Sequence, residues 1–191
     1  GSTAASNAMA IGTGLGGGAS RDPVQSFVSP YGMTTVGSYA LVAQRHMHLY
    51  GTRSEQLAEI AVAMRKHASL NPHAKMQKPI TVDDVMQSRV ISDPLHLLDC
   101  CIISDGGGAV IVTSVERARD LAKPPVVLPG SGEAVCHQEI GPPDLLTPAA
   151  KPSSEHAFAT APVSHDDIDL RTIYDPFTIT VLPTLQNLGL C

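Results

Sequence analysis

Short apolar runs alternate with helix-start signals along residues 99–191, and this alternation limits the possible folds more than any other feature of the chain. The runs Ala109–Val112, Val126–Leu128 and Asp169–Tyr174 have the length and composition of buried strands. A predicted helix follows each of them. Strands that alternate with helices pack as a sheet covered by helices, so this part of the chain is predicted to be α/β.

The first two of these helices are predicted from capping signals. Thr113–Glu116 has the spacing of a capping box, in which a hydroxyl and a carboxylate satisfy free amides at a helix start, and it predicts a helix through Leu121. A helix of about three turns is expected after Thr147–Pro148, and Pro152 must lie in its first turn or delay its start.

A third helix is predicted close to the end of the chain. Asp175 is its expected N-cap and Pro176 its first residue, because proline is well suited to that position. Pro183 should kink the helix, and Gly189 should end it. Its apolar positions are Thr178, Val181, Leu182, Leu185 and Leu188.

Residues 31–98 have a helical pattern instead. Apolar residues recur at helical spacing on two successive segments, with Gly51 between them and a capping box at Thr52–Glu55. The two helices should form a hairpin that stops at Asn71–Pro72, and Thr81–Asp84 should start another short helix. The predicted faces are Val36, Tyr39, Ala40, Ala43 and Met47, and then Leu57, Ile60, Ala61, Met64 and Ala68.

Composition excludes several classes of protein. The chain is 43% hydrophobic and 16% charged, which favours a folded domain over a disordered one. The net charge is −5 with no basic run, so we expect no nucleic-acid partner. No apolar stretch is long enough to span a membrane, and Gly1–Ala4 does not begin a secretory signal. We expect a cytoplasmic protein.

The residues that often bind metals or nucleotides carry weak signals here. The four cysteines (Cys100, Cys101, Cys136 and Cys191) lack zinc-type spacing and are expected to be reduced and mostly buried. His46 and His48 point to different helix faces, so we predict no metal site. The motif Gly12-x-Gly14-x-x-Gly17 is followed by loop residues, which favours a flexible loop over a nucleotide site.

Two segments could lie at a binding site. Gly106–Gly108 would let a ligand or a packed helix approach the backbone, and the sequence favours neither. Tyr174 ends a predicted strand directly before a helix N-terminus, where amide donors favour a developing anion. The alternative for Tyr174 is a packed side chain whose hydroxyl is satisfied by backbone.

Several segments together resemble the thiolase superfamily, especially its acetyl-CoA acetyltransferase and lipid-transfer, sterol-carrier-associated branch. Tyr31–Thr35, the helical hairpin and its turn Tyr50–Gln56 resemble the loop domain of that family. Leu98–Ala109 resembles the stretch that opens its C-terminal half. Ile168–Phe177 lies where thiolases carry Asn-Glu-Ala-Phe, and Leu188–Cys191 resembles the Leu-Gly-Phe-Cys that follows.

The resemblance implies a domain organisation. Residues 1–30 would be a Gly/Ala/Ser-rich end of the N-terminal half, 31–98 the helical loop domain, and 99–191 the first part of the C-terminal α/β domain. The implied fold is a thiolase-like, five-layer α/β fold of two similar halves, of which this chain is an internal part. The family's nucleophilic cysteine and its Gly-His-Pro and Cys-x-Gly segments would lie outside the chain, so we expect this chain alone to lack thiolase activity.

The resemblance also implies roles for individual residues. Tyr174 replaces an asparagine that helps to hold a carbonyl-polarising water, and a phenol there would donate to an enolate oxygen or exchange a proton. Cys101 lies where a CoA-contacting serine is common, and Tyr31 where a methionine lines the acyl pocket. Gly32 and Ser104, in the same two motifs, complete the expected substrate- or CoA-binding set.

The implied function is that of an acyltransferase acting on coenzyme A thioesters, by C–C bond thiolysis or Claisen condensation. The alternatives are a retro-aldolase of acyl-CoA side chains that uses Tyr174, and a non-catalytic CoA- or lipid-binding protein. The resemblance further implies a homodimer and a small OB-fold or zinc-ribbon partner. No tightly bound cofactor is expected.

Overall fold

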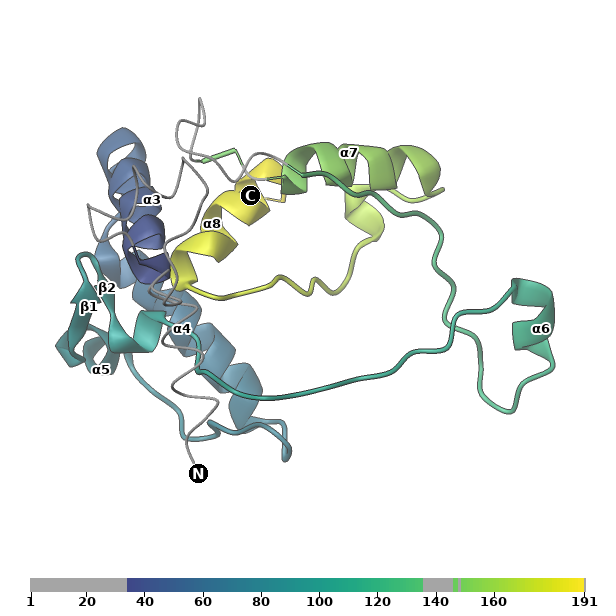
Figure 1. Ribbon diagram of the computed structural model, residues 1–191, viewed down its shortest axis with the longest axis horizontal. Coiled ribbons are helices and arrows are strands. Elements are labelled where there is room, and N and C mark those ends of the chain that lie inside the picture. The colour runs from purple at the N-terminus through teal and green to yellow at the C-terminus, as the bar shows by residue number, and fades with distance from the viewer. Residues whose placement is uncertain (1–33, 136–145, 148, 191) are drawn as a thin grey trace, which may run out of the picture.

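The computed structural model describes residues 34–135, 146–147 and 149–190. In Figure 1, helices α3, α4 and α8 gather with a small β-hairpin into one packed body, and α6 lies at the far end of a long extended excursion. The predictions for residues 1–30, including the glycine motif, lie outside the described residues, as do Tyr31 and Gly32.

The first helix, α3 (Thr35–Tyr50), has the predicted apolar face and the predicted end. Thr34 caps it by accepting a hydrogen bond from Gly37 N at 3.1 Å. Gly51 ends it in the left-handed conformation, with φ 69°, which glycine adopts without a steric penalty. The predicted hairpin is confirmed, because α4 (Ser54–Ser69) follows after a short turn.

The capping box predicted at Thr52–Glu55 is wrong. Helix α4 begins one residue later than that box requires, with Arg53 as the N-cap, and Gln56 Oε1 accepts from Arg53 N at 2.8 Å. Thr52 does not cap because its hydroxyl is hydrogen-bonded to Nδ1 of the buried His46 at 2.7 Å. A distant buried side chain thus outcompetes the local signal.

Helix α5 (Val82–Gln87) begins as predicted. Asp84 N donates to Thr81 Oγ1 at 3.1 Å, and Thr81 N donates to Asp84 Oδ2 at 2.8 Å. This reciprocal pair is a capping box. The helix buries Val85 against α4 in a small apolar cluster with Ala58 and Ala61.

An antiparallel hairpin follows that the sequence did not predict. It pairs β1 (Val90–Ser92) with β2 (Leu95–His96), and the turn between them contains the cis Asp93–Pro94 peptide. The short 3₁₀ helix η2 (Leu97–Asp99) comes directly after it. The strands are too short to show a periodic apolar pattern.

The strands predicted at Ala109–Val112, Val126–Leu128 and Asp169–Tyr174 are not strands in this structure. Their residues form no ladder with any other described segment, although Ile111 is 93% exposed and Val126 is 99% exposed. A strand needs a partner for its backbone amides and carbonyls, and apolar composition alone cannot supply one. The described residues therefore show mixed helix with few strands, and the layered sheet of the prediction is not among them.

Two more caps differ from the prediction by one to three residues. Helix α6 (Val115–Arg119) is capped by Ser114, whose Oγ accepts from Arg117 N, and not by Thr113. Helix α8 (Thr178–Asn187) has Phe177 as N-cap, so the prediction of Asp175 as N-cap and Pro176 as first residue is wrong. Phe177 is extended there because it forms an isolated antiparallel bridge with Cys100.

Helix α7 (Ala150–Thr160) has the predicted length of three turns, and Pro152 lies in its first turn. The short 3₁₀ helix η3 (His165–Asp167) separates it from the chain that leads to α8. Gly189, with φ 69°, follows the last residues of α8, and Leu190 N donates to Leu185 O at 3.0 Å. That bond is the signature of a Schellman ending.

The main core lies where α3, α4 and α8 meet, and this position fixes the start of α8. Helix α8 contacts α3, α4 and α7, and its Ile179 is fully buried. His46 ties α3 to the far end of α8, because Gln186 Oε1 accepts from its Nε2 at 3.1 Å. The buried cluster consists of Ala40, Ala43, Leu57, Leu95, Phe177 and Ile179.

Candidate active site

Tyr174 lies at the mouth of a cleft of about 410 Å³ between α3 and α8. Its side chain is 82% exposed, so its hydroxyl is not the satisfied, packed group of the alternative interpretation. Most of the cleft surface is apolar and belongs to the chain before α8 and to one face of α8. The cleft is lined by Tyr39, Val42, Thr172, Ile173, Tyr174, Pro176, Thr180, Pro183, Thr184 and Leu188.

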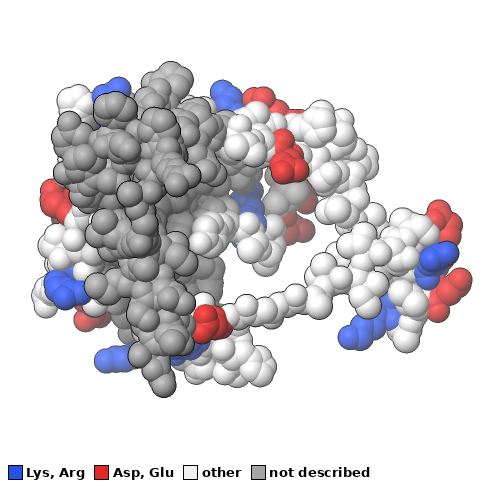
Figure 2. Space-filling view, in the orientation of Figure 1, with Lys and Arg blue, Asp and Glu red and all other residues white. Residues whose placement is uncertain are grey.

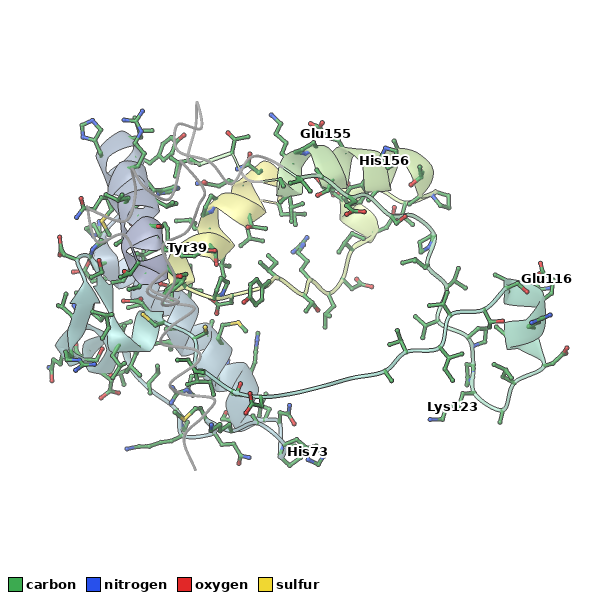
Figure 3. The ribbon with its side chains drawn as sticks, viewed as in Figure 1. Tyr39, His73, Glu116, Lys123, Glu155 and His156 are labelled. Atoms are coloured by element: carbon green, nitrogen blue, oxygen red, sulfur yellow. The ribbon has the colours of Figure 1, made fainter. Side chains whose placement is uncertain are left out.

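Tyr39, on α3, is the second phenol of this cleft (Figure 3). Its ring packs on Phe177, with centroids 4.5 Å apart and planes tilted by 33°. Burial raises the pKa of the Tyr39 phenol, and the nearby Tyr174 and Cys101 raise it further. The sequence had placed Tyr39 on the apolar face of a helix, and nothing in that pattern indicated a second phenol beside Tyr174.

The backbone after Tyr174 is held against residues 99–101. Cys101 N donates to Pro176 O at 3.0 Å, and Cys100 bridges Phe177. Pairing of these two short segments determines where Tyr174 emerges from the core. It also brings Cys101 into the neighbourhood of both phenols, as the pKa of Tyr39 indicates.

A second cleft, of about 280 Å³, lies on the other side of this pairing, against α4. Met64, Arg65 and Ile80 line one wall, and residues 98–102 line another. Asp175 faces this cleft and is half-buried. Burial raises the pKa of its carboxyl, and the adjacent Asp99 raises it further.

The cysteines differ in exposure, which corrects the prediction of mostly buried thiols. Cys101 is exposed and borders the second cleft, whereas Cys100 is half-buried. Burial raises the pKa of Cys100 to about 11, with smaller contributions from Asp99 and Cys101. Its thiol also donates to His96 O at 3.3 Å. Cys100 is therefore held as a neutral thiol and is unsuited to nucleophilic attack.

The remaining residues predicted at the site do not join this cluster. Ser104 is exposed and lines neither cleft. Within the described residues, no atom lies within 4 Å of where a side chain at Gly106, Gly107 or Gly108 would begin, so nothing approaches that backbone closely. Tyr31 and Gly32 lie outside the described residues.

Two further observations bear on partners. Over residues 34–135, 146–147 and 149–190, no group of three His, Cys, Asp or Glu side chains is placed to hold a metal ion. No helix in the same ranges is long and apolar enough to cross a membrane. On the face shown in Figure 2, basic and acidic side chains are interspersed, and both signs occur around α6.

A tyrosine before a buried helix start, on a helical core of this type, occurs in thiolase-like proteins. Residues 132–191 match the family model described as "Thiolase C-terminal domain-like". The chain is 39% identical over 178 residues to the steroid side-chain-cleaving aldolase of Thermomonospora curvata. It is 37% identical over 171 residues to the acetyl-CoA acetyltransferase of Methanothermobacter thermautotrophicus.

These matches cover most of this chain but less than half of the relatives. The aligned regions make up 87% and 86% of this chain, and 44% of each relative. The solved structure "Ltp2-ChsH2(DUF35) aldolase" superposes with a TM-score of 0.79 at 36% identity, over 97% of this chain and 55% of that one. The chain belongs to the thiolase superfamily, as its motifs predict.

Proposed function

We propose that the intact protein is an acyl-CoA enzyme that cleaves a C–C bond by a retro-aldol reaction, with Tyr174 at the reacting carbonyl. The observation that carries this proposal is the exposed phenol of Tyr174 at the mouth of an apolar cleft beside Tyr39. The 39% identity to a protein named as a steroid side-chain-cleaving aldolase supports it.

The reaction needs an oxygen stabiliser more than it needs a nucleophile. In a retro-aldol cleavage, a base removes the proton of the β-hydroxyl, the Cα–Cβ bond breaks, and its electron pair becomes the enolate of the CoA thioester. A ketone or aldehyde leaves, and a proton then returns to Cα. A phenol that donates to the thioester oxygen stabilises the charge as it develops there. Tyr174 would take this role.

Thiolysis or Claisen condensation is the second candidate, and the similarity to an acetyl-CoA acetyltransferase favours it. Both reactions require a thiolate nucleophile, which Cys100, with a pKa of about 11, does not supply. Under this candidate, the acyltransferase would take its nucleophile from residues other than Cys100. A CoA- or lipid-binding protein without activity is the third possibility.

Two assays on the intact protein separate these candidates. An acyl-CoA with a β-hydroxyl on a branched carbon should be cleaved to a carbonyl compound and a shorter acyl-CoA, without added free CoA. A β-ketoacyl-CoA with free CoA should not be cleaved. Cleavage of only the β-ketoacyl-CoA would replace the aldolase proposal with thiolysis, and binding without turnover of either would favour the third possibility.

The assembly and compartment also belong to the proposal. We expect a homodimer with a layered thiolase-like fold, in which residues 109–112, 126–128 and 169–173 gain strand partners. The solved structure named above is titled as a complex, which supports a partner for this chain of the OB-fold or zinc-ribbon kind. A coenzyme A thioester is the expected substrate, Cys101 and Ser104 remain the proposed CoA-binding residues together with Tyr31 and Gly32, and the cytoplasm is the expected compartment.

A further inference from the structure

Asp99 is a buried carboxylate at the centre of the contacts that hold the start of α8. Its side chain belongs to a residue that is only 4% exposed. Thr178 Oγ1 donates to Asp99 Oδ1 at 2.8 Å, and His96 N donates to Asp99 Oδ2 at 2.8 Å. One carboxylate thus joins the β-hairpin to the first residue of α8, which lies 79 residues later in the chain.

Helix α8 depends on this carboxylate because its own N-cap supplies no side-chain cap. Phe177 stands at the N-cap position and cannot accept from the free amides of the first turn. A negative charge beside the first turn is favoured by the helix dipole. Asp99 therefore provides, from a distant segment, the function that a local Asp or Ser would normally serve.

The same carboxylate is connected to Tyr174 by a short, fully held segment. Thr178 bonds to Asp99, Phe177 bridges Cys100, and Pro176 O accepts from Cys101 N, so three successive residues are fixed to residues 99–101. Tyr174 is two residues before the first of them. Asp99 also acts on the neighbour of Tyr174, since after burial it is the cause that raises the pKa of Asp175.

We propose that Asp99 is a positioning residue for Tyr174: through Thr178 it fixes the start of α8 and thereby the direction in which the Tyr174 phenol enters its cleft. This role rests on the proposed function, in which Tyr174 serves the reaction. Catalytic geometry tolerates little displacement, and a shift of about 1 Å can lower a rate on the order of a hundredfold.

The test uses the intact protein with three substitutions. Thr178→Val removes only the hydroxyl that donates to Asp99, Asp99→Asn keeps an acceptor for Thr178, and Asp99→Ala removes both acceptors. We expect Asp99→Ala to lower kcat about tenfold or more with little change in KM, Thr178→Val to do so to a smaller extent, and Asp99→Asn to recover part of the loss. The double variant should be no worse than Asp99→Ala, because both changes break one interaction.

Asp84→Ala is the matched control. Asp84 caps α5 through Thr81 as Asp99 serves α8, but no contact links it to the segment after Tyr174. It should lower Tm without changing kcat. If Thr178→Val and Asp99→Asn lower Tm but leave kcat as unchanged as Asp84→Ala does, Asp99 is only structural and the proposal is wrong.

A second readout is independent of the reaction. 3-Fluorotyrosine placed at position 174 should give one ¹⁹F resonance that broadens or splits in Thr178→Val and stays unchanged in Asp84→Ala. If Tyr174→Phe proves as active as the unaltered protein, the proposed function fails and this resonance alone decides the role of Asp99. An unchanged resonance in Thr178→Val would overturn that role whatever the kinetics show.

Discussion

Tyr174 and Tyr39 face the same cleft from opposite elements, and the phenol of Tyr174 lies close enough to raise the pKa of Tyr39 further, after burial. The two differ in exposure, since Tyr174 is exposed and Tyr39 packs on Phe177. The exposed phenol is free to meet a ligand, and the packed one is held as its neutral neighbour. This division determines which tyrosine a kinetic experiment should change first.

Tyr174→Phe in the intact protein should lower kcat on the order of a hundredfold or more, the usual scale for losing one donor to a developing oxyanion. KM should change little, because the hydrogen bond would strengthen only in the transition state. Steady-state kinetics of acyl-CoA cleavage measure both constants. Tm should stay nearly constant, because the side chain is 82% exposed.

Tyr50→Phe is the control for this substitution. Tyr50 ends α3, is exposed, and packs against His46, so its loss of a hydroxyl is chemically identical but remote from Tyr174. It should leave kcat and KM unchanged. Equal kinetics for Tyr174→Phe and the unaltered protein would reduce Tyr174 to part of the cleft wall.

Cys100 should resist alkylation in the folded protein. Its pKa of about 11, against an ordinary value of 9.0, lowers the thiolate fraction at pH 8 about a hundredfold. In a Cys101→Ser variant, iodoacetamide should therefore modify Cys100 roughly a hundredfold more slowly when the protein is folded than in denaturant, as followed by peptide mass spectrometry. Similar rates in the two states would show that the thiol is not held neutral.

The helices were predictable because their hydrogen bonds lie within the segment that carries the pattern. The apolar face containing Tyr39 and Ala43 and the capping box at Thr81–Asp84 are both local signals, and both are confirmed. The capping box at Thr52–Glu55 failed because Thr52 bonds to His46 across the turn. The strands failed because their partners cannot be read from the runs themselves.

The site was predictable only in part, for the same reason. Tyr174 was found from its place before a helix start, although that start lies three residues later than Asp175 would have set it. The bond from Thr178 to Asp99 joins residues far apart in the chain, and no spacing rule connects them. The raised pKa of Asp175 follows from that same long-range packing, which the sequence could not indicate.

Ile111→Lys should have opposite effects in the 191-residue chain and in the intact protein. In this chain the side chain is 93% exposed, so lysine costs no packing and removes an exposed apolar strand that favours aggregation. Light scattering should fall while the helical circular dichroism stays constant. In the intact protein a buried sheet position would make the same change destabilising, by several kcal/mol.

Leu57→Lys is the control for the short chain. Leu57 is 1% exposed in the main core, so a charge there should abolish the helical signal. If Ile111→Lys leaves scattering unchanged in the short chain, residues 109–112 do not drive association. If it leaves the Tm of the intact protein unchanged, those residues are not in a layered sheet.

Asp175→Asn should stabilise the protein at neutral pH. Burial and then Asp99 raise the pKa of Asp175 in the folded state above its ordinary value of 3.8. A group with a raised folded pKa contributes stability that is fully present below the unfolded pKa and is lost as pH rises through the folded pKa. Above that range the charged Asp175 lowers the free energy of unfolding, and asparagine cannot take up this charge.

Tm measured from pH 3 to pH 8 checks this sign, with Asp84→Asn as the control. The Tm of Asp175→Asn should exceed that of the unaltered protein at pH 7 and converge with it below about pH 3.8. Asp84 should behave in the opposite way, because hydrogen bonds from Thr81 lower its pKa and its contribution is lost as pH falls. Asp84→Asn should therefore lower Tm at pH 7 and converge in acid. A Tm difference for Asp175→Asn that does not vary with pH would show that Asp175 carries no shifted proton, and that its carboxyl does not interact with Asp99.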